Sequence, residues 1–299
     1  MLHWVKKHQI IIGDFALICM TVIWGSTFFV VKDQLRFIDP VTMVFYRFAA
    51  ASLILGLYLF FRRIPLFHNW RRGLIVGFWL WVIYVAQNIG MLYTTASNSG
   101  FITALNIVFV PILSLMMFRH MPSKTRILAS CVSVTGMWLL TGGLHGMNCG
   151  DVITLFSALA CAFYVLYSDK YLKQGMSPVV LCFQSLFVVF VLSFVWMVVL
   201  QRPFELNPSR TLGALLYLTL VATVLAFTVN LYVQKISTPM RVTLIYASEP
   251  VFAALFACYF LGESLNRVQW LGGGLIVLAM MLSELKRPVL KMMGRIGAG

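Results

Sequence analysis

The fold is decided by long apolar runs, of which residues 179–200 are the clearest; they read VVLCFQSLFVVFVLSFVWMVVL. These 22 residues hold no charged side chain, and a helix of this length, rising 1.5 Å per residue, crosses the hydrocarbon core of a bilayer. Inside a bilayer each backbone N–H and C=O must find its partner within the segment, so the run is expected to be helical. The sequence therefore predicts an integral membrane protein.

The composition of the whole chain favours the same class of protein. Of its 299 residues, 61% are hydrophobic and 11% are charged, whereas a soluble domain carries about 25% charged residues. The mean hydropathy is +0.89. The net charge of +14 raises the question of nucleic-acid binding, but the basic residues lie between the apolar runs and form no folded basic face. We therefore expect no nucleic-acid partner, and we assign the basic residues to loops retained in the cytoplasm.

Ten apolar runs are expected to form transmembrane helices, at residues 11–31, 41–61, 73–94, 98–117, 126–142, 151–169, 179–200, 211–234, 242–260 and 267–284. The third and fourth runs are separated only by a short polar turn, but together they are too long for one crossing. With the N-terminus inside, 17 Lys and Arg residues lie in inner segments and 5 in outer segments. This bias predicts cytoplasmic termini and a multi-pass protein of the inner membrane.

An internal repeat is visible along the chain. Residues 39–45 read DPVTMVF and residues 177–183 read SPVVLCF, a shift of 138. Two further pairs recur at shifts of 137 and 139, Gly13-Asp14 with Gly150-Asp151 and Pro111 with Pro250. The agreement of the three shifts predicts two repeats within one membrane domain.

The predicted repeats are residues 1–146 and 147–299, with five helices each. Because five is odd, the second repeat would enter the membrane from the opposite side, which is the inverted arrangement of many secondary transporters. The expected fold is thus all-α, with ten transmembrane helices in two inverted halves. The substrate would bind between the halves near the middle of the membrane.

Three segments together carry a resemblance to a known family. The first helix contains IWGSTF at residues 23–28, the third and fourth helices are joined by YTTASNSGF at residues 93–101, and the ninth contains SEPVFAAL at residues 248–255, followed by Leu261-Gly262-Glu263. Across roughly residues 14–284 the chain resembles the drug/metabolite transporter superfamily, EamA type. This resemblance implies a ten-helix fold with a central cavity and, often, export of amino acids or related metabolites. It does not name the substrate.

The chain departs from the commonest pattern of that superfamily in two places. Tyr246-Ala247-Ser248 precedes Glu249 where Leu or Phe often stands, and Asn106 lies within the fourth helix. Such differences are expected to tune the pocket.

Two charged residues lie within predicted helices, where an ionised side chain costs about 2.5–3.5 kcal/mol. Glu249 is placed about eight residues into the ninth run, where its carboxylate would bind a substrate amine or a coupling proton. Arg47 lies about seven residues into the second run, where its planar donor fork would bind a substrate carboxylate. The alternative is structural: the two residues pair with each other, Glu249 binds backbone freed by Pro250, or Arg47 extends toward the outer surface.

Neutral polar and aromatic residues within the runs complete the predicted substrate site. Tyr84, Gln87 and Asn88 share a broad face of the third helix. Aromatic walls with a few hydrogen-bonding groups are typical of a small-molecule pocket, whereas packing between helices and interfacial aromatic belts are the alternatives. The full set of substrate-binding candidates is Trp24, Arg47, Tyr84, Gln87, Asn88, Asn106, Tyr164, Asn230, Tyr246 and Glu249.

Other residues are given structural roles. Asp14 and Asp151 are expected to cap the starts of the first and sixth helices. Pro111 and Pro250 occupy matching places in the two halves and are candidate hinges, or else static kinks. Gly272-Gly273-Gly274 predicts close packing between helices, with a dimer contact as the weaker alternative, so we expect a monomer.

The motifs that are missing narrow the function. The chain contains no GxxxxGK[ST] loop, and its five histidines lie outside the apolar runs. The predicted topology brings together neither a set of metal ligands nor a Ser/His/Asp catalytic triad. We therefore expect no enzyme activity, no cofactor and no metal. The leading hypothesis is a secondary exporter of amino acids or related metabolites, working by alternating access. Proton coupling is a separate and weaker hypothesis, motivated by Glu249. The alternatives are an importer, or a non-transporting membrane receptor or assembly protein.

Overall fold

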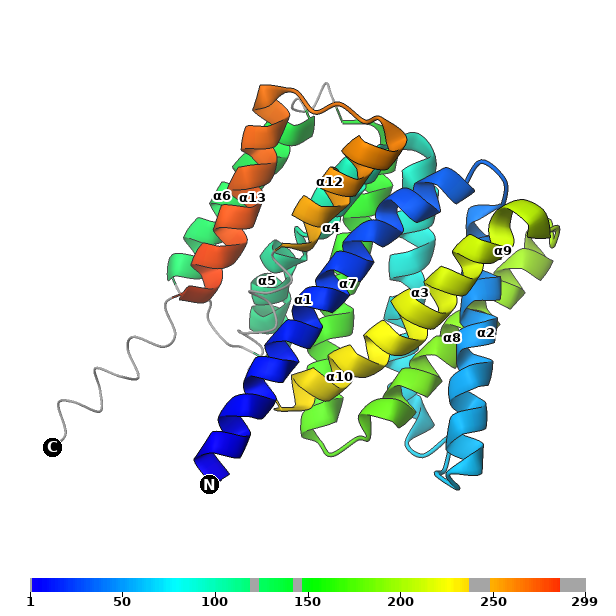
Figure 1. Cartoon of the computed structure of the whole chain (residues 1–299). Helices are drawn as coiled ribbons and strands as arrows, with labels where there is room; N and C mark the ends of the chain where they lie inside the picture. The colour runs from blue at the N-terminus through cyan, green and yellow to red at the C-terminus, as the bar shows by residue number, and fades with distance from the viewer. Residues whose placement is uncertain (1, 119–123, 142–146, 237–247, 286–299) are drawn as a thin grey trace, which may run out of the picture.

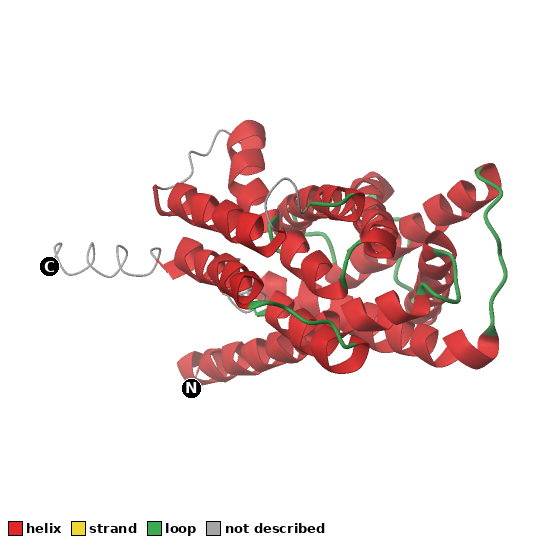
Figure 2. Ribbon diagram, turned by 90° about the horizontal axis from the view of Figure 1, so that it is seen from above, coloured by secondary structure: helices red, strands yellow, loops and turns green. Residues whose placement is uncertain are grey.

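The computed structural model describes residues 2–118, 124–141, 147–236 and 248–285, which form a bundle of helices with no strand among them (Figure 1, Figure 2). In chain order the helices are α1 (Leu2–Gln34), α2 (Pro40–Phe61), α3 (Trp70–Tyr93), α4 (Ala96–Thr103), α5 (Asn106–Phe118), α6 (Lys124–Thr141), α7 (Cys149–Lys173), α8 (Pro178–Val199), α9 (Pro208–Leu216), the π-helix η1 (Tyr217–Leu225), α10 (Ala226–Ile236), α12 (Glu249–Leu261) and α13 (Arg267–Leu285).

Seven segments of the described chain are long and apolar enough to cross a membrane: Phe15–Gln34, Pro40–Phe61, Trp70–Tyr93, Ala96–Met117, Cys149–Lys173, Pro178–Val199 and Pro208–Val233. Three shorter apolar helices accompany them, Ile127–Leu140, Glu249–Leu261 and Arg267–Ala279. The expected all-helical membrane architecture is confirmed to this extent. The number of crossings, the inversion of the halves and the side on which the termini lie stay predictions.

The predicted fourth helix, residues 98–117, is wrong as a single helix. α4 ends at Thr103 and α5 begins at Asn106. Between them the Leu105 N–H bonds to the Ile102 carbonyl at 3.0 Å, and the Val108 N–H bonds to the Leu105 carbonyl at 2.8 Å. These bonds span three residues and tighten the chain locally, so one apolar run contains two helical pieces.

The starts of two helices also differ from the prediction. α1 begins at Leu2, so Asp14 lies inside this helix and its predicted capping role is wrong. α12 begins at Glu249, so Glu249 lies in the first turn and not eight residues into a helix. Pro250 is in that same first turn, where its missing N–H costs no helical hydrogen bond. Pro111 lies inside α5 as predicted.

Glycines allow the closest helix contacts in the bundle. A Cβ added to Gly90 of α3 would lie 2.9 Å from the Gly150 carbonyl oxygen of α7, and one added to Gly272 of α13 would lie 2.6 Å from the Gly136 carbonyl oxygen of α6. Figure 1 shows α6 and α13 side by side as a separate pair. Close packing at Gly272 is therefore confirmed, whereas a Cβ on Gly274 would meet nothing within 4 Å.

Polar contacts hold the turn between α3 and α4. The Lys32 ammonium donates to the carbonyls of Met91 and Thr94, at 2.5 and 2.8 Å, and the Thr94 hydroxyl donates to the carboxylate of Asp151. Asp151 also accepts from the Asn148 N–H at 3.1 Å, which completes a capping box. The predicted cap at Asp151 is thus confirmed, and the ends of α1 and α3 meet the start of α7.

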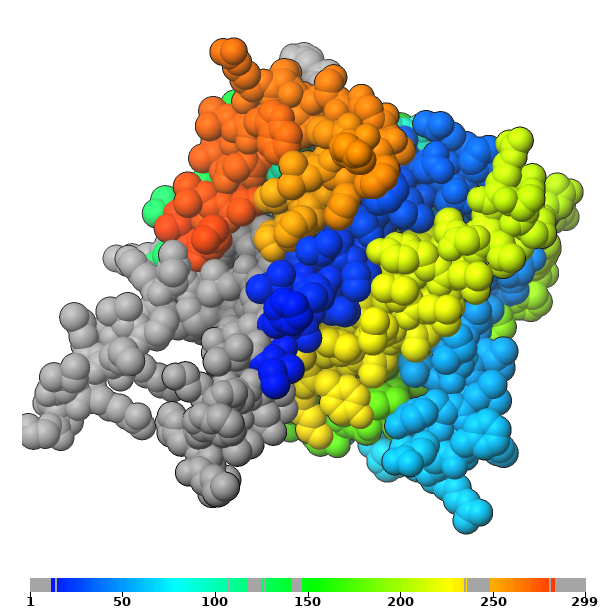
Figure 3. Space-filling model, in the orientation of Figure 1, coloured from blue at the N-terminus to red at the C-terminus, as the bar shows by residue number. Residues whose placement is uncertain are grey.

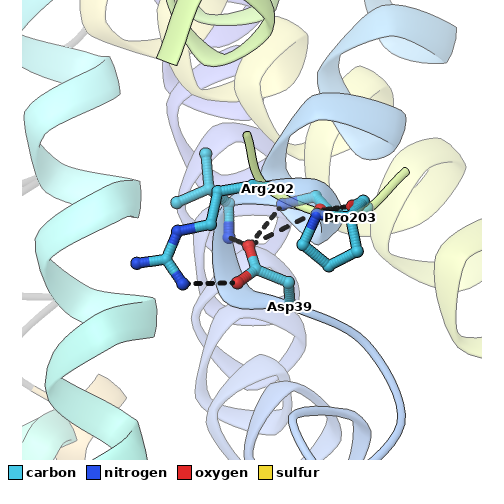
Figure 4. Close-up of polar contacts among 5 residues, drawn as sticks. Asp39, Arg202 and Pro203 are labelled. Atoms are coloured by element: carbon cyan, nitrogen blue, oxygen red, sulfur yellow. Dashed lines mark hydrogen bonds and ion pairs between the residues drawn. The ribbon is translucent and has the colours of Figure 1, made fainter. Parts of the chain in front are cut away.

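A second polar contact joins the α1–α2 loop to the α8–α9 loop (Figure 4). Asp39 caps α2 by accepting from the N–H groups of Val41 and Thr42, at 2.9 and 3.2 Å. The Arg202 guanidinium lies 3.4 Å from the other oxygen of Asp39, and the Thr42 hydroxyl donates to the Pro203 carbonyl at 2.6 Å. The start of α2 is thereby fixed against the end of α8.

Candidate functional site

The side chain of Phe227 in α10 lies among three aromatic residues that were predicted for the site. Its ring centroid is 5.4 Å from that of Trp24 in α1 and 6.3 Å from those of Tyr84 in α3 and Tyr164 in α7. The four rings therefore come from helices of both halves of the chain. They form a contiguous aromatic cluster, as expected for the wall of a small-molecule site.

Arg47 of α2 lies beside this cluster. Its side chain is 2% exposed, and its guanidinium carbon is 4.7 Å from the ring centroid of Tyr84 and 5.5 Å from that of Phe48. Its Nε donates to the Thr223 hydroxyl at 2.6 Å, and a terminal nitrogen lies 3.4 Å from the Tyr84 hydroxyl. Both partners are neutral, and no described acidic side chain lies within ion-pair distance of Arg47.

Two further candidates lie one helical turn away from the aromatic cluster. Gln87 follows Tyr84 by one turn of α3 and donates to the Thr103 hydroxyl at 3.2 Å. The Asn106 amide donates to the sulfur of Cys161 at 3.2 Å, one turn before Tyr164 on α7. These contacts bring the α4–α5 segment up to the same faces of α3 and α7.

Glu249 stands at the first turn of α12, next to α1. A Cβ on Gly25 would lie 3.1 Å from the Glu249 carbonyl oxygen, so the absence of that Cβ lets α12 approach closely beside Trp24. In the space-filling view, α12, α1 and the η1–α10 segment lie side by side on one face (Figure 3). The Glu249 side chain is half-buried, and among the described residues its carboxylate has no hydrogen-bond or ion-pair partner. The alternative that Glu249 pairs with Arg47 is therefore not observed.

Of the remaining candidates, Asn88 faces away from the aromatic cluster, Asn230 follows Phe227 on the same helix, and Tyr246 is not among the described residues. Asn88 is buried and donates to the Pro40 carbonyl at 3.3 Å, so its amide faces the start of α2 and not the aromatic cluster. Asn230 is buried in α10, one turn after Phe227. Tyr246 lies outside the described residues.

Two residues of the site, Phe227 and Thr223, had not been predicted from the sequence. Phe227 is one of 24 phenylalanines in the chain, and nothing in its local sequence sets it apart. Thr223 lies in an apolar run, where a threonine hydroxyl usually bonds to its own helix backbone. Its contact with Arg47, 176 positions away, could not be inferred from either local sequence.

A separate hollow of about 640 Å³ lies on an apolar face of α12. It is lined by Leu255, Phe256, Cys258, Tyr259 and Phe260. None of these is a candidate site residue, and the apolar lining suits contact with lipid chains. This hollow is therefore separate from the candidate site.

Comparison with known proteins adds to this geometry. The model of the EamA-like transporter family matches the chain twice, over residues 11–142 and 148–285. The chain belongs to the EamA-like transporter family. It is therefore a multi-pass membrane transporter of the drug/metabolite transporter superfamily, as the sequence motifs had indicated.

Relatives within the EamA family span nearly the whole chain. An uncharacterized transporter of Archaeoglobus fulgidus is 32% identical over 276 residues, covering 92% of this chain and 86% of its own. The uncharacterized inner membrane transporter YedA of Escherichia coli is 27% identical and covers 90% of both chains. A probable amino-acid metabolite efflux pump of Salmonella typhimurium is 22% identical and covers 88% of this chain and 91% of its own.

The fold of the EamA chain also has a counterpart among solved crystal structures. One such structure superposes with a TM-score of 0.63 and covers 95% of this chain and 98% of that one. The sequence identity is 16%, so the likeness concerns the fold alone.

Within the EamA chain, the motif at residues 23–28 now has a structural explanation. Gly25 packs against α12, whereas its neighbours face the π-helix: the Trp24 indole donates to the Ala222 carbonyl at 3.0 Å, and the hydroxyls of Ser26 and Tyr217 are 2.5 Å apart. The motif thus joins α1 to one helix on each side.

Proposed function

We propose that this protein is a secondary transporter that exports amino acids or related small metabolites, and that Arg47 binds the substrate carboxylate. The observation that carries the proposal is a guanidinium that is 2% exposed and has only neutral hydrogen-bond partners among the described residues. A buried charge without a counter-charge is costly, so structural arginines are usually paired with carboxylates. A substrate carboxylate would supply the missing negative charge through charge-assisted hydrogen bonds.

Glu249 is the proposed partner of the substrate amine and of the coupled proton. Its carboxylate is half-buried and has no partner among the described side chains. It lies in the first turn of α12, where the helix dipole favours a negative charge. Arg47 and Glu249 do not form an ion pair with each other. Both charges are therefore available to a zwitterionic substrate, which we place between α2 and α12.

Alternating access between two inverted five-helix repeats, residues 1–146 and 147–299, is the proposed mechanism. The two matches to the family model support the division into repeats. The packing of the helices supports it too: α2 lies on α8 and α6 on α13, each pair joining helices at corresponding places in the two halves. Likewise α3 packs on α7 in the way that α10 and η1 pack on α1. Pro111 and Pro250 remain the hinge candidates.

The proposed direction and location are supported by the charge distribution and by the names of the relatives. The 17-to-5 bias of Lys and Arg supports termini in the cytoplasm, and YedA is named as an inner membrane protein. The Salmonella relative is named as a probable efflux pump for amino-acid metabolites. We therefore propose export across the inner membrane, by one copy of the chain within the lipid bilayer.

Ligand binding to purified protein in detergent tests the proposed chemistry. Thermal unfolding is followed with three ligands: L-phenylalanine, 2-phenylethylamine, which lacks the carboxylate, and 3-phenylpropanoate, which lacks the amine. We expect L-phenylalanine to raise the midpoint of the wild-type protein most, because ligand binding stabilises the folded state by mass action. Arg47→Gln should remove the advantage of L-phenylalanine over 2-phenylethylamine, and Glu249→Gln its advantage over 3-phenylpropanoate. If Arg47→Gln still distinguished the acid from the amine as the wild type does, Arg47 would not be the carboxylate site.

A further inference from the structure

The helix that follows the α8–α9 loop contains an unusual wide segment, η1, at the centre of its length. Nine residues, Tyr217–Leu225, are π-helical, whereas π segments are rare and mostly single turns, often at functional sites. The Thr223 hydroxyl donates at 2.7 Å to the Leu218 carbonyl, five residues back. The N–H of Ala226 bonds to the carbonyls of Thr223 and Val221 and passes over that of Ala222.

The carbonyl that is passed over has a partner in another helix. The Trp24 indole of α1 donates to the Ala222 oxygen at 3.0 Å. At the start of the same segment the Tyr217 hydroxyl lies 2.5 Å from the Ser26 hydroxyl, also in α1. In an ordinary α-helical register the Ala222 carbonyl would be shared between the Ala226 N–H and the Trp24 indole. In the π register this carbonyl is left to Trp24, so the bond from α1 favours the π register.

The π register fixes the position of Thr223 against α2. Thr223 is fully buried, and its hydroxyl uses its proton on the Leu218 carbonyl and its oxygen to accept from Arg47 Nε at 2.6 Å. Because the proton is already committed, the oxygen can serve Arg47 only as an acceptor. The same segment also contacts the backbone of Arg47, since the Thr219 hydroxyl lies 3.5 Å from the Arg47 carbonyl.

We propose that Thr223 is a positioning residue for substrate binding: it holds Arg47 by the Nε atom and directs the two terminal nitrogens toward the substrate carboxylate. Trp24 acts through it, because the Trp24–Ala222 bond maintains the register that presents the Thr223 oxygen. The inference rests on the proposed carboxylate-binding role of Arg47. The Arg47 guanidinium is held at Nε by Thr223, and one terminal nitrogen also lies 3.4 Å from the Tyr84 hydroxyl. The terminal nitrogens still carry further N–H groups for a carboxylate, and a guanidinium that is already oriented loses less freedom on binding, so the pre-set geometry strengthens binding.

The test measures counterflow of L-phenylalanine into liposomes containing the purified protein, with 2-phenylethylamine as a competing ligand. Thr223→Val has nearly the same shape but no acceptor oxygen. It should raise the KM for L-phenylalanine about tenfold, the usual scale for one hydrogen bond to a charged group, and leave the maximal rate within about twofold. Inhibition by 2-phenylethylamine, which has no carboxylate, should be unchanged.

Two variants separate positioning from general damage. Thr223→Ser keeps the hydroxyl and should restore the wild-type KM. Thr219→Val, in the same segment and also buried, removes a hydroxyl that contacts only the backbone of Arg47 and should leave the KM unchanged. If Thr223→Val does not fold, Thr223→Cys replaces the oxygen by a weakly accepting sulfur and gives the same comparison.

The outcomes distinguish this inference from the function on which it rests. Wild-type protein that transports none of the twenty common amino acids, or whose transport is inhibited by no carboxylate, would overturn the proposed function and this inference with it. Active wild type with an unchanged KM in Thr223→Val, or an equal rise in Thr219→Val, would overturn only the positioning role. A rise in KM confined to Thr223→Val and restored by Thr223→Ser would support it.

Discussion

Glu263 offers a quantitative test of how the two halves are joined. Its carboxylate accepts three hydrogen bonds from the start of α4: the Ala96 N–H at 2.7 Å, the Ser97 N–H at 3.1 Å and the Ser97 hydroxyl at 2.6 Å. Glu263 lies in the loop after α12, whereas α4 belongs to the first half of the chain. The Glu263 carboxylate, which follows α12, therefore caps the start of α4.

The magnitude of the contact follows from the number and type of its bonds. Loss of a capping side chain costs about 1 kcal/mol, and hydrogen bonds to charged groups contribute about 1.5–3 kcal/mol each. Because three bonds share one carboxylate and water replaces part of what is lost, we expect Glu263→Ala to cost about 2–3 kcal/mol. At about 2 °C per kcal/mol for a chain of this size, the unfolding midpoint should fall by about 5 °C.

The assay is thermal unfolding of purified variants in one detergent, followed by size-exclusion chromatography of the heated samples. Glu205→Ala is the matched control, because Glu205 is an exposed acid in the α8–α9 loop with no hydrogen bond to a described residue. Glu263→Gln, which keeps one carbonyl oxygen as an acceptor, should fall between the wild type and Glu263→Ala. If Glu263→Ala unfolded at the same temperature as Glu205→Ala, the capping account would be refuted.

Two further predictions concern packing and coupling. Gly272→Ala should lower the unfolding midpoint by several degrees, because the new Cβ would lie 2.6 Å from the Gly136 carbonyl oxygen. Gly274→Ala is the control: its Cβ would meet nothing within 4 Å, so the midpoint should stay unchanged or rise slightly. Equal effects of the two variants would contradict the observed packing of α6 on α13. We expect substrate flux into liposomes with the wild-type protein to change with a pH gradient. Glu249→Gln cannot release a proton, so its flux should be the same with and without the gradient; a full response in the variant would exclude Glu249 as the coupling group.

Hydropathy predicted the helices well because burial in lipid requires apolar runs of fixed length. Each of the seven span-length segments overlaps a predicted run. The cap at Asp151 was predicted correctly from an acid near a helix start, whereas the same reasoning failed at Asp14 because α1 begins at Leu2. The details of helix geometry were not predictable. The break between α4 and α5 contains a local bond from the Leu105 N–H to the Ile102 carbonyl, and the π register of η1 leaves the Ala222 carbonyl to the distant Trp24 indole. Hydropathy does not report individual hydrogen bonds, and it also missed the start of α12 at Glu249.

In the candidate site, too, the types of residue could be predicted and their contacts could not. The chemistry of Trp24, Arg47, Tyr84 and Tyr164 could be predicted, because large polar or aromatic residues inside apolar runs need partners. Their arrangement around Phe227 could not, because it depends on the crossing of helices far apart in the chain; Trp24 and Phe227 are separated by 203 positions. Asn88, which shares a helix with Tyr84, bonds to the Pro40 carbonyl of α2 and lies away from the cluster.

The most direct test of transport through a carboxylate-binding site is counterflow with the purified chain alone in liposomes. Liposomes loaded with a mixture of the twenty common amino acids receive each radiolabelled amino acid in turn from outside, with wild-type and Arg47→Gln protein in parallel. We predict that the wild type transiently accumulates at least one amino acid, and that the analogue of that amino acid with the carboxylate but without the amine inhibits this accumulation. Arg47→Gln should accumulate none. No accumulation by the wild type, or equal accumulation by Arg47→Gln, would contradict the account.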